Sequence, residues 1–163
     1  MEMSIIIRNV EDNNIKEATT IWNEIVEEAN SFPGDHILSA VEAKQMFQEQ
    51  TQANCIYYND EMAGLYILHP NNIGRCSQIA NASYAITKRY RGKGLGKALV
   101  LDSIEKAKQN GFIGLQFNAV VSSNTRAIAL YIQLGFTIIG TIKNGYRNKD
   151  NTYSDTIIFL KSW

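Results

Sequence analysis

The sequence has few of the residues that cross-link, kink or coordinate. Its 163 residues include 2 cysteines, 2 prolines and 2 histidines. Cys55 and Cys76 do not form a CxxC pair, so we expect reduced thiols and neither a disulfide framework nor redox chemistry. His36 and His69 lie far apart in the sequence, and we assign both to the surface or to loops. These absences predict that the protein binds no metal ion.

The sequence also lacks an excess of charge of either sign and any long apolar run. Sixteen basic residues balance sixteen acidic ones, so a general affinity for nucleic acid or for an anionic membrane is not expected. The first ten residues, MEMSIIIRNV, contain only a short apolar run without a basic leader. No segment approaches the length of a membrane helix or resembles a signal peptide. We therefore predict a cytoplasmic protein.

The elements that the sequence does contain predict one mixed α/β domain over residues 1–163. The length suits a single compact domain, and no repeat or linker interrupts it. Apolar spacing favours helices with buried stripes, and Ser39 is the expected cap of the second helix, which runs to about Gln50. Gly111 is the expected stop of the third. We expect strands at 4–10, 54–60, 61–70, 78–87, 113–121, 137–144 and 152–162, and a polar loop at 145–151. We expect helices at 15–29, at 39–50, from the stretch 91–100 to about 110, and within 122–136.

The stretch RGKGLGKALV, residues 91–100, places three glycines at the start of a predicted helix. A helix start has unpaired N–H groups and a partial positive charge, so it attracts phosphate, and glycine lets the backbone approach closely. Five cations lie within ten residues with no acid among them: Lys88, Arg89, Arg91, Lys93 and Lys97. The alternative is a glycine-eased turn with solvated lysines.

Two common phosphate-binding motifs do not fit this stretch. A Walker loop needs Gly-Lys followed by Ser or Thr, whereas Leu95 follows Gly94; the dinucleotide fingerprint has a further glycine where Lys97 stands. The stretch does fit R-x-x-G-x-G and resembles the acetyl-CoA pyrophosphate loop of the GNAT superfamily of N-acyltransferases. The resemblance implies a cofactor site at Arg91, Gly92, Lys93, Gly94, Leu95, Gly96 and Lys97.

A second block, NTRAIALYIQLGF at 124–136, is similar to the next motif of the same superfamily. The resemblance makes Asn124 a cofactor-binding residue, although a helix N-cap is the alternative and one residue can do both. It also makes Tyr131 a cofactor neighbour that gives a proton to the departing thiolate, whereas its spacing alone would place it in the core. A thiol pKa of about 8.5 and a phenol pKa of about 10 make this transfer nearly balanced.

The resemblance covers residues 79–159 and implies a fold and a reaction. The fold is a splayed, mostly antiparallel sheet of about seven strands flanked by about four helices. The backbone of Tyr84, Ala85 and Ile86 would pair with the pantetheine arm of acetyl-CoA, the co-substrate. A backbone N–H would hold the developing oxyanion, and the amine would attack directly without a covalent enzyme intermediate.

The strand that precedes the glycine turn lacks the carboxylate that many relatives use as a general base. It reads Asn81, Ala82, Ser83 and Tyr84, so a water relay or a partly deprotonated substrate would have to replace that base. Asn81 and Asn118 each stand mid-strand among apolar residues, and both amides could face the cleft. A structural role in the splayed sheet is the alternative for each. We predict Asn81 as a catalytic and substrate-binding residue and Asn118 as a substrate-binding residue.

The stretch LHPNNIGRCSQIANASY is similar to the corresponding part of fungal proline-analogue N-acetyltransferases, which act on azetidine-2-carboxylate and related amino acids. This similarity implies that the acceptor is a small amino acid or amine. Phe32 and Tyr146, with His36 and Arg147, are the candidates for the rest of the acceptor wall. Mobile polar loops are the alternative for these segments.

The sequence therefore predicts an acetyl-CoA-dependent N-acetyltransferase that acts on a small-molecule amine. The alternatives are a non-catalytic acyl-CoA sensor, an acetyltransferase that acts on a protein or peptide amine, and a nucleic-acid binder that uses the basic turn. Neither a nucleic acid nor a membrane is an expected partner. Dimers are common in the superfamily, so a homodimer is among the expected assemblies.

Overall fold

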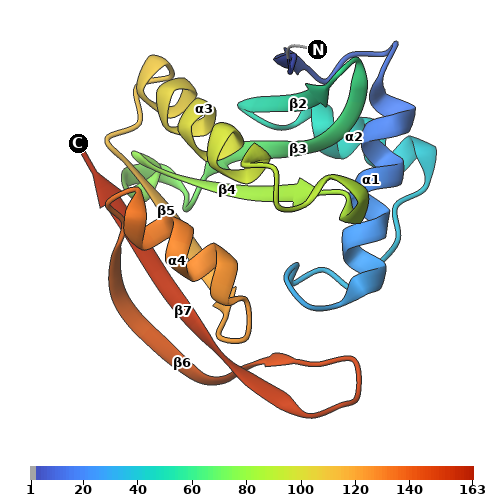
Figure 1. Cartoon of the computed structure of the whole chain (residues 1–163). Coiled ribbons are helices and arrows are strands. Elements are labelled where there is room, and N and C mark those ends of the chain that lie inside the picture. The colour runs from blue at the N-terminus through green and yellow to red at the C-terminus, as the bar shows by residue number, and fades with distance from the viewer. Residues whose placement is uncertain (1–2) are drawn as a thin grey trace.

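The computed structural model describes residues 3–163 as one seven-stranded sheet with four α-helices (Figure 1). This confirms the mixed α/β fold predicted from the sequence. Two short 3-10 turns lie at Gly74–Cys76 and Lys88–Tyr90. The elements are β1 (Ile5–Asn9), α1 (Ile15–Glu28), α2 (Ala40–Gln48), β2 (Gln52–Tyr58), β3 (Glu61–Pro70), β4 (Ile79–Ile86), α3 (Leu95–Gln109), β5 (Gly114–Val121), α4 (Thr125–Gln133), β6 (Thr137–Arg147) and β7 (Tyr153–Ser162).

The sheet opens between its two central strands. Its order is β1-β2-β3-β4-β5-β7-β6, and every neighbouring pair is antiparallel except β4 and β5. That parallel pair is joined only between 79–81 and 114–116, after which the two strands diverge (Figure 1). The predicted splay is therefore present, and it begins directly after Asn81.

Helices cover both faces of the sheet and create two cores. α1 and α2 pack on one face, where Ile21, Ile25 and Phe47 meet Leu65 of β3. α3 packs on the other face, where Leu99 belongs to a larger cluster that also includes residues of β3, β4, β5 and β7. Because it is covered on both faces, β3 is buried along most of its length, as a central strand should be.

Local sequence accounts for the helix ends that were predicted. The Ser39 side chain accepts a hydrogen bond from the Glu42 N–H at 3.2 Å, and the Ser39 N–H donates to Glu42 Oε2 at 3.4 Å, which forms a capping box. Gly111 has φ +83° just after α3, a left-handed conformation that glycine adopts without strain. Both boundaries confirm the prediction.

The predicted polar loop at 145–151 is shorter than expected: its first three residues, 145–147, belong to strand β6, and only 148–151 lie outside the strands. β6 continues to Arg147, with Tyr146 opposite Ser154 and Arg147 opposite Tyr153. A register shift between Ile142 and Tyr146 absorbs Asn144, which has φ +56° and donates its N–H to Asp155 Oδ1 at 2.9 Å. This bulge lets the strand resume beyond residues whose polarity indicated a loop.

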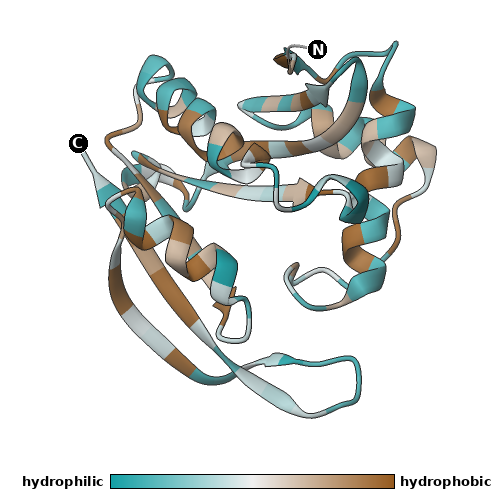
Figure 2. Cartoon of the chain, in the orientation of Figure 1, coloured by the Kyte–Doolittle hydropathy of each residue, from teal (hydrophilic) through white to brown (hydrophobic). Residues whose placement is uncertain are grey.

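Hydropathy follows this layered arrangement. Figure 2 shows hydrophobic residues in the central strands and along helical stripes, with hydrophilic residues on the loops and outer helix faces.

Burial also raises the pKa of the Cys55 thiol in β2 to about 12, so this cysteine behaves as a small apolar core residue. Within residues 3–163 no helix combines the length and the hydropathy that crossing a membrane requires.

Candidate active site

The glycine turn exposes the start of α3. Gly92 and Gly94 have φ values of +81° and +77°, and Gly94 is the N-cap, so no side chain satisfies the first N–H groups of the helix. A Cβ at Gly94 would meet no atom within 4 Å, and a Cβ at Gly96 would lie 3.8 Å from Leu130 Cδ2. Backbone conformation thus explains Gly92 and Gly94, but neither conformation nor packing requires Gly96. An anionic ligand that approaches the helix start would explain it.

A groove with a volume of about 730 Å³ lies against this turn. The ends of α1 and β4, the start of α3 and one side of α4 form its walls. Its size is within the usual range for sites that hold a cofactor or a large ligand. Of the predicted cofactor residues, those that line the groove are Tyr84, Ile86, Arg91, Gly92, Gly94, Leu95, Gly96, Lys97, Asn124 and Tyr131, whereas Ala85 and Lys93 do not.

Arg91 is tied to its neighbours in the protein. Its Nη1 and Nη2 atoms donate to the two carboxylate oxygens of Glu28 at 2.9 and 2.5 Å, and its Nε donates to Ile86 O at 3.0 Å. The guanidinium therefore joins the end of α1, the end of β4 and the glycine turn. The structure gives Arg91 a clamping role in addition to its place in the groove lining.

The other cations near the turn differ in whether they line the groove. Lys93 Nζ lies 5.3 Å from the centroid of the Tyr58 ring, and Arg89 pairs with Glu61. Lys97 lines the groove, and so does Arg126 of α4, whose Nη1 would be 3.9 Å from a Cβ at Gly92. Sequence reasoning missed Arg126, because nothing local to it indicates that the starts of α3 and α4 lie side by side.

Beyond the splay, β4 offers a free backbone edge to the groove. β3 pairs with one edge of β4 as far as Ile86, but the pairing with β5 on the other edge stops at Asn81. The Tyr84 side chain turns under α3, where its hydroxyl lies 2.6 Å from Ser103 Oγ. An extended ligand arm could add to this edge as a further strand.

Tyr131 lies where the groove meets a second cavity. Its ring packs among aromatic residues, with centroids 4.4 Å from Phe117 and 5.5 Å from Phe159. Gln50 Oε1 is the only buried side-chain nitrogen or oxygen without a hydrogen-bond partner in residues 3–163. The Tyr131 hydroxyl also makes no hydrogen bond within residues 3–163, yet it is not among the buried atoms that lack a partner. It must therefore be accessible from the cavities that the Tyr131 side chain lines. Burial raises the pKa of Tyr131, which keeps it protonated.

The second cavity has a volume of about 120 Å³ and lies in the opening between β4 and β5. No charged side chain is among the residues that line it. Ser31, Tyr84, Asn124 and Tyr131 border both this cavity and the groove, so the two adjoin. The other lining residues are Phe32, Pro33, Asn81, Ala82, Ser83, Phe117, Asn118, Ala119, Val120 and Val121.

Asn124 caps α4, as one of its two predicted roles requires. Its Oδ1 accepts a hydrogen bond from the Ala127 N–H at 3.4 Å. The same side chain borders both cavities. Since capping uses only the amide oxygen, the amide nitrogen remains available to a ligand.

Asn81 and Asn118 both line the second cavity, and a third asparagine connects them. Asn81 Nδ2 donates to Asn71 Oδ1 at 3.1 Å, and Asn118 Nδ2 donates to the same oxygen at 2.8 Å. The sequence reasoning missed Asn71. It lies directly after β3, and only the pairing of β3, β4 and β5 places it beside the other two.

The predicted acceptor wall is only partly present. Phe32 lines the second cavity, but Tyr146 does not; its hydroxyl donates to Phe32 O at 3.1 Å and its ring borders a neighbouring cavity of about 460 Å³. Arg147 lies 3.9 Å from Asp35. These contacts hold the β6–β7 hairpin against the loop after α1. His36 is exposed and pairs with Glu42 at 2.8 Å, away from the cavity lining.

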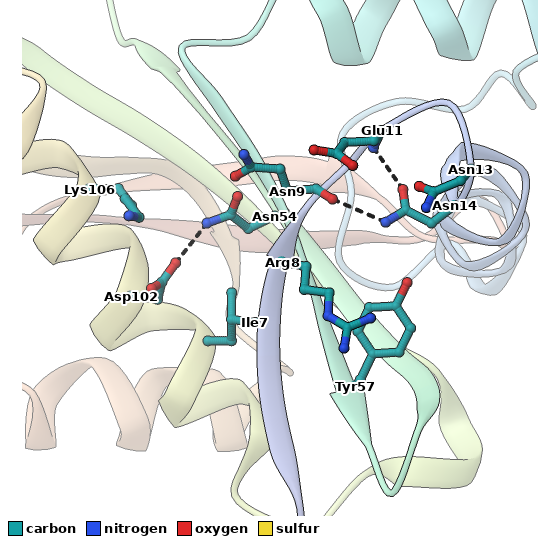
Figure 3. A pocket seen from close by; sticks show the side chains of 10 residues that line it. All are labelled: Ile7, Arg8, Asn9, Glu11, Asn13, Asn14, Asn54, Tyr57, Asp102 and Lys106. Atoms are coloured by element: carbon teal, nitrogen blue, oxygen red, sulfur yellow. Dashed lines mark hydrogen bonds between the residues drawn. The ribbon is translucent and has the colours of Figure 1, made fainter.

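A fourth cavity, of about 420 Å³, lies beside the edge strand β1 (Figure 3). Two of its asparagines are hydrogen-bonded within the protein: Asn54 Nδ2 donates to Asp102 Oδ2 at 2.9 Å, and the Asn14 side chain donates to Asn9 O and accepts from the Glu11 N–H. It contains none of the predicted site residues. Across residues 3–163, no three His, Cys, Asp or Glu side chains gather as a metal-binding group would.

Comparisons with known proteins agree with this arrangement. Residues 19–136 match the family described as the Acetyltransferase (GNAT) family. The N-acetyltransferase aca1 of the fission yeast Schizosaccharomyces pombe is 27% identical over 98% of this chain and 84% of its own. Streptothricin acetyltransferase A of Bacillus subtilis is 31% identical over 71% of this chain and 70% of its own.

The fold is equally similar to solved structures. A phosphinothricin acetyltransferase from Sinorhizobium meliloti, solved in complex with acetyl-CoA, superposes with a TM-score of 0.90. The comparison covers 97% of this chain and 88% of that one, at 19% sequence identity. At that identity the similarity concerns the fold alone.

Proposed function

The chain belongs to the GNAT acetyltransferase family, and we propose that it transfers the acetyl group of acetyl-CoA to the amine of a small amino acid or a related small molecule. The observation that carries the proposal is the junction of the two cavities at Tyr131 and Asn124. The larger one begins at an uncapped helix start that suits a diphosphate, and the smaller one is uncharged and lined by amides. A donor and an acceptor could meet at this junction.

The residues of the groove would hold acetyl-CoA by complementary means. The N–H groups at 94–97 would bind the pyrophosphate, with Lys97 and Arg126 nearby to balance its charge. The free edge of β4 would bind the pantetheine arm through backbone hydrogen bonds. Together these contacts would direct the thioester toward Tyr131.

Tyr131 would act as the proton donor in the transfer. As the amine attacks the thioester carbonyl, a C–N bond forms and the C–S bond breaks, which leaves a thiolate. Burial raises the pKa of Tyr131, so its hydroxyl carries a proton at neutral pH but is a weaker acid than a free phenol. Because the thiolate would form in the same buried place, burial would raise the pKa of the thiol as well, and the proton would pass from Tyr131 to the sulfur; water would return a proton to Tyr131 afterwards. A backbone N–H of β4 would stabilise the negative charge on the carbonyl oxygen during the attack.

The amine would lose its proton without a neighbouring carboxylate or histidine. The residues that line the acceptor cavity are all uncharged. Bulk water or an ordered water would therefore take the proton of an ammonium substrate, or the amine would arrive already neutral. In either case, water would also take the second proton, which the nitrogen loses as the amide forms. We expect the rate to rise with pH according to the pKa of the acceptor amine.

The volume and chemistry of the cavity favour a small acceptor. A volume of about 120 Å³ corresponds to roughly four water molecules. The relative named for streptothricin is named for a small molecule. A protein or peptide amine would need to reach the cavity past the contacts of Tyr146 and Arg147 with the loop after α1.

We also expect the enzyme to act in the cytoplasm, where Cys55 and Cys76 would stay reduced.

A thiol-release assay with acetyl-CoA tests this proposal. The panel contains amino acids, polyamines, aminoglycosides and peptides. We expect thiol release with small amino acids or amines, and expect Asn81→Ala to raise the KM for the acceptor about tenfold with a much smaller effect on the KM for acetyl-CoA. Binding of acetyl-CoA without release for any acceptor would instead indicate a sensor, and equal effects on both KM values would remove Asn81 from the acceptor site.

A further inference from the structure

Asn71 lies where the sheet opens and contacts both of the strands that separate there. It follows the last residue of β3, and its N–H donates to Ile79 O at 2.8 Å, which fixes its backbone against the first residue of β4. Its Oδ1 accepts hydrogen bonds from Asn81 Nδ2 of β4 at 3.1 Å and Asn118 Nδ2 of β5 at 2.8 Å. A single oxygen atom thus receives donors from two strands.

This link stands where the backbone no longer joins the strands. The last paired residues of β4 and β5 are Asn81 and Gln116, and Asn118 lies two positions beyond them. Asn81 and Asn118 line the acceptor cavity, but Asn71 does not. Asn71 can therefore affect a substrate only through the other two side chains.

The hydrogen bonds determine what the two amides can still offer. Each amide nitrogen carries two hydrogens, and one from each is directed to Asn71 Oδ1. The oxygen of Asn118 is already occupied, because it accepts from Gln116 Nε2 at 3.0 Å. One N–H remains free on Asn81 and one on Asn118, and Asn81 Oδ1 also has no donor in the described part of the chain, so the network leaves two hydrogen-bond donors and one acceptor in a cavity lined by uncharged residues.

We propose that Asn71 is a positioning residue that holds the amides of Asn81 and Asn118 so that their free N–H groups bind the carboxylate of a small amino acid. This inference rests on the proposed acetyl transfer to a small acceptor. Paired N–H donors suit a carboxylate, because hydrogen bonds to an ionised acceptor are stronger than those between neutral groups. They offer nothing to an amine that has no acceptor group.

Three variants test the proposal. Asn71→Ala removes the shared oxygen, whereas Asn71→Asp keeps an oxygen that can accept both hydrogen bonds and has no N–H to donate. Asn72→Ala is the matched control, because Asn72 is adjacent and exposed and its side chain accepts only from its neighbour's N–H, that of Ile73. Thermal unfolding of each variant shows whether the fold is retained.

The first measurement is the NMR spectrum of the side-chain amides of Asn81 and Asn118, which needs no substrate. We expect both pairs of signals to move upfield in Asn71→Ala, where the hydrogen bond is lost, to move downfield in Asn71→Asp, where the acceptor is ionised, and to stay near their native positions in Asn72→Ala. Unchanged signals in Asn71→Ala would show that no link exists. An upfield shift in Asn71→Asp, as in Asn71→Ala, would show that Asn71 acts as a donor and would overturn the assignment of free N–H groups.

The second measurement compares the KM for an amino acid with the KM for the amine that lacks its carboxylate, such as L-azetidine-2-carboxylate and azetidine. We expect Asn71→Ala to raise the first about tenfold and the second less than about threefold, with kcat nearly unchanged. Equal changes in both would overturn the carboxylate role. If the native enzyme acetylates no acceptor, the proposed function fails and so does the carboxylate role, whereas the NMR result still decides whether Asn71 positions the two amides.

Discussion

The groove and the acceptor cavity adjoin at Tyr131 but are built in different ways. The end of the groove where we propose that phosphate binds comes from one continuous stretch, residues 91–97, and presents backbone N–H groups at a helix start. The cavity proposed for the acceptor draws side chains from the loop after α1, from β4, from β5 and from α4. In the proposed function, one region would bind its ligand with the backbone, and the other would do so with side chains that distant segments bring together.

This difference shows which properties of the site can vary independently. A backbone site depends on local conformation and on open space, so its requirements appear as glycines in a short motif. A side-chain site depends on the sheet register, and under the proposed function a change at one of its positions would alter acceptor binding without disturbing donor binding. We therefore expect variants in the two regions to affect different kinetic constants.

The largest effect is expected at the junction, for Tyr131→Phe. This change removes the hydroxyl that opens to both cavities and keeps the ring that packs on Phe117. A lost proton donor should lower kcat roughly 100-fold, while the KM for acetyl-CoA stays within about twofold. Because burial raises the pKa of Tyr131, the native kcat should show no alkaline decline from this group below about pH 10.

Tyr84→Phe is the matched control for Tyr131→Phe. Tyr84 borders the same two cavities, but its hydroxyl is already paired with Ser103. Its loss should lower the free energy of unfolding by about 1 kcal/mol and leave kcat nearly unchanged. Steady-state kinetics at saturating acceptor distinguish the two variants, and an equal decline in kcat for both would return Tyr131 to a purely structural role.

A second, smaller effect is expected in the groove alone, for Gly96→Ala. A methyl group at this position would lie 3.8 Å from Leu130 Cδ2, so the folded chain has room for it, and alanine suits a helix better than glycine. We expect an unchanged or higher melting temperature, but a rise of about tenfold in the KM for acetyl-CoA because the methyl group would stand where the backbone must approach phosphate.

Gly140→Ala serves as the control for Gly96→Ala. Gly140 lies in β6, outside the lining of both cavities, and a Cβ there would be 3.6 Å from Ile158 Cδ1. Calorimetric titration with acetyl-CoA should give native affinity for this variant. Native affinity for Gly96→Ala as well would mean that no ligand approaches the backbone at this position.

The sequence predicts the residues that line the groove far better than those that line the second cavity, and the reason is physical. Gly92, Gly94 and the cap of α4 at Asn124 are requirements of neighbouring backbone, so a short motif contains them. The strands and helices were predicted for the same reason, since periodicity and caps are local. The exception is β6, where a bulge at Asn144 continues the strand through polar residues.

The acceptor region depends on contacts between distant segments. Asn81 and Asn118 were predicted from their unusual place in apolar strands, but no sequence pattern of this kind singles out Asn71. Tyr146 was assigned to the acceptor wall from its place in a presumed loop, whereas strand pairing turns its hydroxyl to Phe32 O. Arg126 was missed because only the packing of α4 brings it to the groove. Sheet register and helix packing decide these positions.

The smallest effect concerns Arg91, whose side chain contacts the protein and whose backbone belongs to the groove. The ion pair with Glu28 is partly exposed, with 34% and 22% of the two side chains accessible, so it should contribute only about 0.5–1 kcal/mol. If the pair clamps the turn, Arg91→Gln and Glu28→Gln should each raise the KM for acetyl-CoA about threefold, and the double variant should be no worse than either single one.

The sign of the Glu28→Gln effect decides between a clamp and a phosphate ligand. Removing the Glu28 charge frees the Arg91 guanidinium, which is otherwise held at 2.5 and 2.9 Å from the carboxylate oxygens. A guanidinium that binds phosphate would then bind more tightly, and the KM for acetyl-CoA would fall in Glu28→Gln but rise in Arg91→Gln. Changes of opposite sign in the KM for acetyl-CoA would show that the Arg91 side chain contributes to phosphate binding. If both single variants raise the KM and the double variant is non-additive, phosphate binding depends on the backbone, and the Arg91 side chain only maintains the shape of the turn.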